Sequence, residues 1–90
     1  MSCYLIVYDI SAPFDAAVNE AIRKAIQDFG TWAHVTDTSW AIVTDKKTSE
    51  VRDELLQHLR EQDRLLVLKS GSVGAWHNVI CRNEWLKEKL

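Results

Sequence analysis

The chain has 90 residues, of which 47% are hydrophobic and 27% are charged, and its formal net charge is −2. This balance is typical of a globular protein and excludes a disordered chain, because the apolar content is enough to offset the entropy lost on folding. The acidic net charge argues against strong nonspecific binding to nucleic acid, which needs a basic surface. The length predicts a single domain over residues 1–90.

The cysteines and the apolar runs limit the cellular setting. Cys3 and Cys81 are the only cysteines, and they are too few and too far apart for a disulfide framework or a zinc motif. We therefore expect two reduced, buried thiols. The first apolar run is too short to span a membrane, and no basic leader precedes a long apolar core. These features predict a cytoplasmic protein without membrane association.

The first third of the chain predicts a strand followed by a helix. Residues 3–8 form an unbroken apolar and aromatic run closed by Asp9, which indicates a buried strand. Apolar residues spaced by three and four then indicate an amphipathic helix over about 14–29. Gly30 follows directly, as is typical of the residue after a helix.

The middle of the chain predicts a hairpin followed by a second helix. Residues 31–35 and 39–43 are rich in β-prone residues, and turn-forming residues separate the two runs. Thr48 is the predicted N-cap of the next helix. Glu50 then lies where the helix dipole favours negative charge. Leucine and valine repeat every four residues after it, which predicts a helix over about 49–60.

The last third predicts a fourth strand over 64–69, a loop over 70–74 and a C-terminal helix over 78–90. The order is therefore β-α-β-β-α-β with an added helix. Right-handed crossovers place both main helices on one face of an antiparallel sheet. The sequence therefore predicts an α+β, ferredoxin-like fold.

The strands are apolar on both faces, whereas the two main helices cover one face only. An open face with tryptophan and tyrosine side chains would be a large exposed apolar patch, which monomers rarely keep. The C-terminal helix can cover that face within one chain. A second copy can also cover it by sheet-to-sheet packing about a two-fold axis. We expect a homodimer that packs through the sheet. Cover by the chain's own C-terminal helix is the alternative.

Asp9 is a candidate functional carboxylate because it ends the first strand, where a side chain can reach a metal or substrate at the sheet edge. The alternative is that Asp9 caps the following turn by accepting backbone N–H groups. One carboxylate per chain is a poor magnesium site. It becomes adequate when a dimer brings two copies together and water fills the remaining octahedral positions.

The histidines show no metal-ligand spacing, so we predict no zinc site. His34 shares strand parity with Trp32. It is a candidate general base or nucleic-acid contact, or else an imidazole packed at an interface. His58 lies beside apolar helix residues and is a structural candidate, and His77 follows a glycine-containing loop where it can be exposed.

Tryptophan and basic side chains offer contacts for nucleic acid. The four tryptophans can stack on bases, or they can pack in the core and at an interface. Acidic neighbours dilute the field of the basic residues, so a solvated surface is the alternative to a phosphate-binding strip. No glycine-rich phosphate loop or dinucleotide fingerprint occurs, which argues against a small-ligand regulatory domain. The basic residues concerned are Arg23, Lys24, Lys46, Lys47, Arg60, Arg64 and Lys69.

The apolar strand Tyr4–Ile10 with its Tyr-Asp ending, the helix ending in Phe29-Gly30 and the hairpin resemble a known family. This family is the small CRISPR-associated spacer-acquisition subunit, called the Cas-two family. Over nearly its whole length, the chain is also similar to a group known as SinR-like proteins. The segments that carry this second resemblance are Phe29-Gly30-Thr31-Trp32, Ser39-Trp40, Thr44-Asp45-Lys46, Arg52-Asp53-Glu54-Leu55, Asp63-Arg64-Leu65-Leu66-Val67 and Asn83-Glu84-Trp85-Leu86.

The resemblance implies a ferredoxin-like homodimer with a role in antiviral defence. Asp9 matches the aspartate that binds the metal in Cas-two nucleases, which implies a magnesium-dependent endonuclease acting on RNA or DNA. Related toxins of the VapD type are ribonucleases. The chain departs from the Cas-two pattern because it carries Ser11 to Asp15 where that family tends to carry arginines.

Two functions follow as expectations. In the first, Asp9 from each protomer holds magnesium and cleaves RNA or DNA, with Ser11 and His34 as helpers. In the second, the chain is a noncatalytic dimeric module that binds nucleic acid or a partner protein. The acidic charge and the few candidate catalytic residues favour the second function, and some members of the Cas-two family act as such scaffolds.

Overall fold

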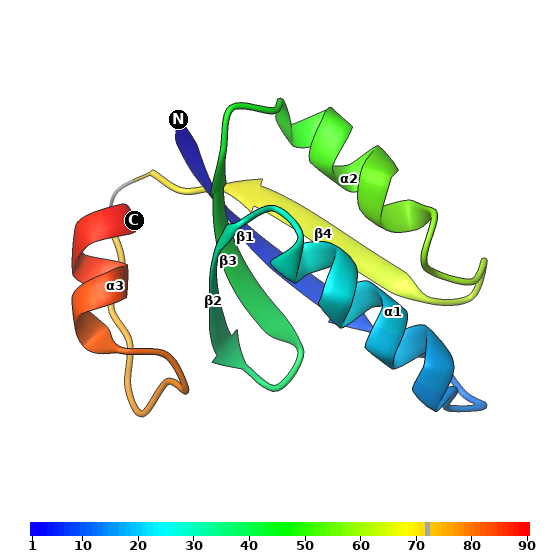
Figure 1. Ribbon diagram of the computed structural model, residues 1–90. Helices are drawn as coiled ribbons and strands as arrows, with labels where there is room; N and C mark the ends of the chain where they lie inside the picture. Colours follow the sequence, from blue (N-terminus) through cyan, green and yellow to red (C-terminus); the bar gives the residue numbers. More distant parts are fainter. Residues whose placement is uncertain (72) are drawn as a thin grey trace.

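The sheet and its helices follow the predicted order. The computed structural model describes residues 1–71 and 73–90. The strands form one antiparallel sheet in the order β2-β3-β1-β4 (Figure 1). This arrangement confirms the α+β, ferredoxin-like fold with a C-terminal helix. The elements are β1 (Ser2–Asp9), α1 (Ala16–Gln27), β2 (Thr31–Thr36), β3 (Ser39–Thr44), α2 (Thr48–Leu56), β4 (Arg64–Lys69) and α3 (Asn83–Lys89).

Helix α1 is shorter by two residues at each end than the predicted 14–29. It begins after Asp15, whose carboxylate accepts hydrogen bonds from the N–H groups of Ala17 at 2.9 Å and Val18 at 3.2 Å. These bonds satisfy two of the amides that a helix start leaves without partners. Past the other end, Gly30 has a φ of +96°, which glycine adopts without the penalty of a Cβ atom. The chain turns there into β2.

Helix α2 begins at Thr48, so the prediction of Thr48 as its N-cap was wrong. The cap is Lys47, whose backbone N–H donates to Oε1 of Glu50 at 2.8 Å. The helix ends at Leu56 and not near residue 60. The N–H of Leu59 bonds to the carbonyl of Leu56, three residues back, which indicates a tighter turn than an α-helix.

The main core lies between α1, α2 and one face of the sheet (Figure 1). Burying one large apolar side chain stabilises a fold by about 1.5–3 kcal/mol, so this cluster supplies much of the driving force. It also fixes the direction of β1 and therefore the place of Asp9 at the strand's end. The buried residues of this cluster are Tyr4, Ile6, Tyr8, Ile22, Ile26, Trp40, Ile42, Val51 and Leu55.

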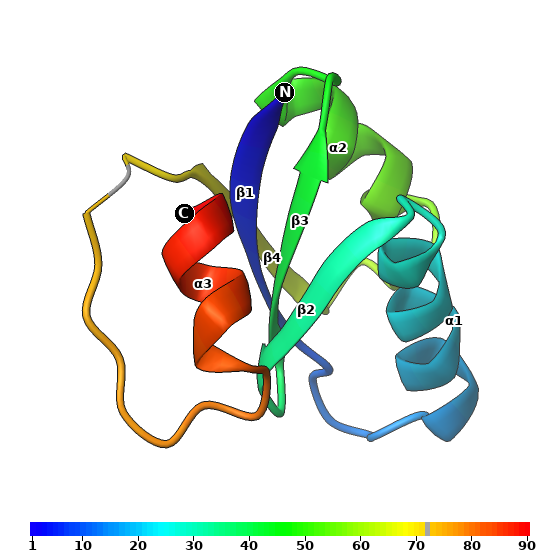
Figure 2. The same ribbon diagram turned by 60° about the vertical axis from the view of Figure 1, so that its left-hand side comes forward.

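The second face of the sheet is partly covered by the chain's own C-terminal segment. Figure 2 shows α3 on the side of the sheet opposite α1 and α2. Leu86 of α3 is only 3% exposed, and the N–H of Ile80 donates to the carbonyl of Val35 at 2.9 Å. Leu66 and Leu68 of β4 remain 50% exposed. The tail therefore provides part of the predicted cover, and an apolar strip of β4 stays open.

The C-terminal region departs most from the sequence prediction. The helix predicted over 78–90 begins only at Asn83, and Asn78 has a φ of +53°, a left-handed value that interrupts a right-handed helix. The loop predicted over 70–74 has no regular structure at its described positions, and Ser72 lies outside the described residues. Within the part of the chain that the structure describes, every helix is too short or too polar to cross a membrane.

Candidate functional site

Asp9 and Ser11 come together around one arginine at the end of β1. Antiparallel pairing of β1 with β4 places Asp9 opposite Arg64, the first residue of β4. Nη1 of Arg64 donates to Oδ2 of Asp9 at 2.8 Å and to Oγ of Ser11 at 3.2 Å. The Asp9 side chain is 61% exposed and that of Arg64 is 73% exposed. A carboxylate, a hydroxyl and a guanidinium therefore meet at one solvent-accessible point.

A buried carboxylate holds the loop that carries Ser11. Asp63 has no exposed side-chain surface, and its carboxylate accepts from the backbone N–H groups of Ser11 at 3.0 Å and Arg60 at 2.8 Å. Hydrogen bonds from the Arg60 side chain are the main cause that lowers the pKa of Asp63. Burial acts in the opposite direction, and the backbone donors reinforce the lowering.

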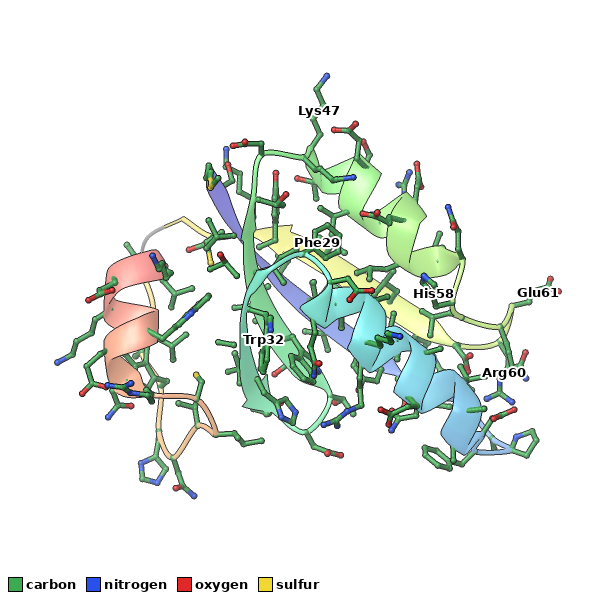
Figure 3. The ribbon with its side chains drawn as sticks, viewed as in Figure 1. Phe29, Trp32, Lys47, His58, Arg60 and Glu61 are labelled. Atoms are coloured by element: carbon green, nitrogen blue, oxygen red, sulfur yellow. The ribbon has the colours of Figure 1, made fainter. Side chains whose placement is uncertain are left out.

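The guanidinium of Arg60 extends this connection to the loop between β1 and α1. Its Nη2 donates to the carbonyl of Ser11 at 2.8 Å, and its Nη1 donates to the carbonyl of Pro13 at 2.9 Å. Oγ of Ser11 donates to the carbonyl of Gln62 at 2.6 Å. Figure 3 shows Arg60 beside this loop and Glu61 pointing away from it. The position of Ser11 is thus set by the segment between α2 and β4.

His34 lies apart from Asp9 and Ser11. Its ring stacks on that of Trp40, with a centroid distance of 4.1 Å and an interplanar angle of 15°. Its Nε2 donates to the carbonyl of Asp37 at 3.1 Å. Among the described residues, no hydrogen bond connects His34 to the other two predicted site residues. The structure therefore joins two of the three candidates and leaves the third in an aromatic cluster.

Asp9, the predicted magnesium ligand, lies apart from any larger group of metal-ligating side chains among the described residues. Magnesium prefers six oxygen ligands in octahedral geometry. Asp9 offers one carboxylate, and the guanidinium of Arg64 already bonds to it. The described residues contain no group of three or more histidine, cysteine, aspartate or glutamate side chains that is placed to hold a metal ion.

The cysteine thiols add no reactive group to this site. Both cysteines are free, Cys3 is buried and Cys81 is partly buried. Burial raises the pKa of each thiol, so the thiolate form is disfavoured. This placement confirms the expected burial for Cys3 and confirms it in part for Cys81.

Three of the predicted basic residues are paired with carboxylates, so acidic side chains interrupt the predicted basic strip. Arg60 bonds to Asp63 and Arg64 bonds to Asp9. Nζ of Lys46 lies 3.5 Å from a carboxylate oxygen of Glu54. Arg23 differs, because its guanidinium carbon lies 5.3 Å from the ring centroid of Trp40 and it forms no ion pair with a described residue.

Sequence reasoning found Asp9 and Ser11 but missed Arg64, Arg60 and Asp63 as parts of one site. The signal for Arg64 was present, because an antiparallel sheet sets the end of strand one beside the start of strand four. The spacing of Arg60 and Asp63, three residues apart in a turn, gave no comparable signal.

In comparisons with known proteins, the chain matches no protein-family model and no curated protein. A ferredoxin-like fold hosts many activities, so function must be argued from these side chains.

Proposed function

We propose that this chain is a cytoplasmic, CRISPR-associated homodimer of the Cas-two type, which binds RNA or DNA and cleaves it with magnesium. The observation that carries the proposal is Arg64, an exposed guanidinium held between the carboxylate of Asp9 and the hydroxyl of Ser11. Arginine binds phosphate through paired, charge-assisted hydrogen bonds. A phosphodiester on Arg64 lies next to a carboxylate and a hydroxyl, which are the groups that phosphodiester hydrolysis uses.

Each side chain of the site has a role in this proposal. Arg64 binds the phosphate, and Ser11 orients it from a loop that Asp63 holds in place. Asp9 of each protomer provides carboxylate oxygens for magnesium, and the ion, when bound, activates water and neutralises phosphate charge. The pair between Asp9 and Arg64 is exposed and therefore weak, so a ligand can open it. The helper role of His34 stays a prediction.

The open strip of β4 supports the homodimer. Leu66 and Leu68 are half-exposed on the second face of the sheet, and Val73 beyond β4 is 94% exposed. Neighbouring exposed apolar side chains of this kind are typical of an interface. A second copy related by a two-fold axis covers the same strip on both protomers.

The dimer can be tested by placing a charge on this strip. Leu68→Lys should convert a dimer into a monomer in sedimentation equilibrium, because a buried lysine in the interface has no partner. Leu56→Lys is the matched control, since Leu56 is 46% exposed on α2, on the other side of the sheet. A wild-type protein that sediments as a monomer would contradict the dimer.

The nuclease proposal is tested with Asp9→Asn, which keeps the shape of the side chain and removes its charge. Wild-type protein should cleave RNA or DNA with magnesium and lose this activity with a chelator, and the variant should be inactive while remaining folded. Asp53→Asn is the matched control, because Asp53 forms a comparable exposed pair with Arg52 at 2.9 Å. Cleavage that persists in Asp9→Asn would rule out the role of Asp9.

A noncatalytic nucleic-acid-binding or protein-binding module is the second candidate, and one observation favours it. The carboxylate of Asp9 is already paired with Arg64, and the described residues contain no group of three or more histidine, cysteine, aspartate or glutamate side chains placed to hold a metal ion. Such a module should bind its partner without divalent ions. Reproducible binding by wild-type protein, together with no cleavage at any magnesium concentration, would select this candidate over the nuclease.

A further inference from the structure

A hollow of about 290 Å³ lies along β2, on a different part of the molecule from Arg60 and its loop. Figure 3 shows Trp32 on β2 beside α1, well separated from Arg60. One wall consists of Trp32, Ala33 and His34. The other wall comes from the C-terminal segment, with Cys81 and Trp85 among its members. In Figures 1 and 2 the chain just before α3 passes beside the end of β2, so both views place these walls together.

The first wall is a supported aromatic surface. Trp32 is 41% exposed, although tryptophan is among the residues that gain most from burial. Behind it, the ring of Trp40 lies 5.4 Å away at an interplanar angle of 56°, and His34 stacks on the same ring. Trp40 is fully buried under α1 and cannot move freely. Trp32 is therefore an exposed indole that packs against a buried, immobile ring.

One arginine lines this hollow, and a second contacts the aromatic cluster beside it. The Arg23 guanidinium lies over the ring of Trp40 and forms no ion pair with a described residue, so its N–H donors are available. Arg82 lines the hollow, and its contact with Glu84 is long, at 3.8 Å between two well-exposed side chains. Such a contact holds little energy in water. The hollow thus combines aromatic walls with one arginine in its lining, Arg82, while Arg23 lies outside the lining, over the Trp40 ring that contacts Trp32.

We propose that this hollow binds one unpaired base of a single-stranded nucleic acid, with the base stacked on Trp32 and the adjoining phosphates held by Arg23 and Arg82. Stacking on aromatic side chains with backbone contacts to arginine is the general mode of single-strand binding. The volume lies just below the range of drug-sized ligand pockets, roughly 300 to 1,000 Å³, so the hollow suits a single flat ring. A duplex keeps its bases paired and cannot insert one.

This inference rests on the proposed function, because it names the form of nucleic acid that the protein would recognise. It also gives the exposed indole of Trp32 a role that is independent of catalysis. Stacking on Trp32 and cleavage at Asp9 depend on different residues, so each can fail while the other stands.

The test measures fluorescence anisotropy of labelled oligouridine, oligodeoxythymidine and a matched duplex, without divalent ions. Trp32→Ala should weaken single-strand binding by roughly five- to a hundredfold, the usual effect of losing one stacked base. Trp32→Phe should retain most of the affinity, and Arg23→Gln should weaken binding and reduce its salt dependence. The control Leu56→Ala removes another half-exposed apolar side chain and should bind like wild type.

The outcomes separate the two proposals. If Asp9→Asn binds single strands like wild type and Trp32→Ala does not, the base site stands whether or not the wild type cleaves. If the protein cleaves and Trp32→Ala binds unchanged, the base site is refuted and the nuclease stands. Equal affinity for duplex and single strand, or no binding of either, would overturn the base site. A change of oligomeric state in Trp32→Ala would show that Trp32 belongs to an interface between copies, which would also overturn it.

Discussion

The ion pair between Asp9 and Arg64 should contribute little to stability, which can be measured with a double-mutant cycle. The charged atoms are 2.8 Å apart, and this distance gives about 1.5 kcal/mol of attraction in the dielectric of bulk water. Holding two side chains in one geometry offsets much of that gain. Exposed pairs therefore show a net coupling of about 0–1 kcal/mol.

The cycle compares wild type, Asp9→Asn, Arg64→Gln and the double variant by urea unfolding, followed by tryptophan fluorescence. Each variant changes the free energy of unfolding relative to wild type. The coupling energy is the change in the double variant minus the sum of the changes in the two single variants. We expect at most about 1 kcal/mol, which corresponds to about 4–8 °C in Tm for a chain of this size. The coupling should shrink at about 1 M salt, where the Debye length is about 3 Å.

A coupling above about 2 kcal/mol would refute this reasoning, because exposed pairs do not reach that value. It would mean that Asp9 fixes Arg64 as a structural partner and is not available to a ligand. A small coupling would show that neither single variant loses much stability with the pair. A loss of cleavage in Asp9→Asn or Arg64→Gln would then reflect the site and not the folding.

The remaining predictions concern the fold around the site. Asp63 has a lowered pKa when folded, so it stabilises the protein above the ordinary aspartate value of 3.8, and that stability should be lost as the pH falls through the folded pKa. Unfolding measured against pH should show this acid limb, and Asp63→Asn should flatten it. Leu55→Ala should cost about 2–5 kcal/mol because Leu55 is fully buried, and the half-exposed neighbour variant Leu56→Ala should change stability by less than about 0.5 kcal/mol. Equal losses of stability in Leu55→Ala and Leu56→Ala would contradict the burial of Leu55 on the inner face of α2. Gly30→Ala should cost about 1–2 kcal/mol from its φ of +96° alone, because a Cβ there meets no atom within 4 Å; a neutral result in thermal unfolding would contradict that backbone conformation.

The sequence carried most of the fold because its local signals and its apolar pattern agree. Strand β4 has the predicted bounds, since charged residues mark both ends of an apolar run. The predicted end of α1 lies two residues past the observed end. Gly30 marks the turn correctly, but Asp28 and Phe29 before it already lie outside the helix. Capping was less predictable: Thr48 has the preferred side chain, yet the bond to Glu50 starts one residue earlier at Lys47.

The tail and the site were harder to predict for a physical reason. A seven-residue helix such as α3 covers about two turns, which is too short for its apolar periodicity to indicate a docking face. The contacts of Asp63 and Arg60 with the loop before α1 join segments about 50 residues apart, and no local pattern encodes them. Asp9 was identifiable because a carboxylate that closes an apolar strand stands out in the sequence itself.

The C-terminal segment has one further consequence, which concerns how the molecule opens. Every buried residue of the main cluster lies between Tyr4 and Leu55, so the interior beneath α1 and α2 persists when α3 lifts away. Leu86 is the buried residue of α3, and Ile80 binds β2 through a single amide. Partial opening of this kind needs far less free energy than global unfolding. We therefore expect the Ile80 amide to exchange with deuterium much faster than the Ile6 amide at the centre of the sheet, and equal rates would show that tail and sheet open as one unit.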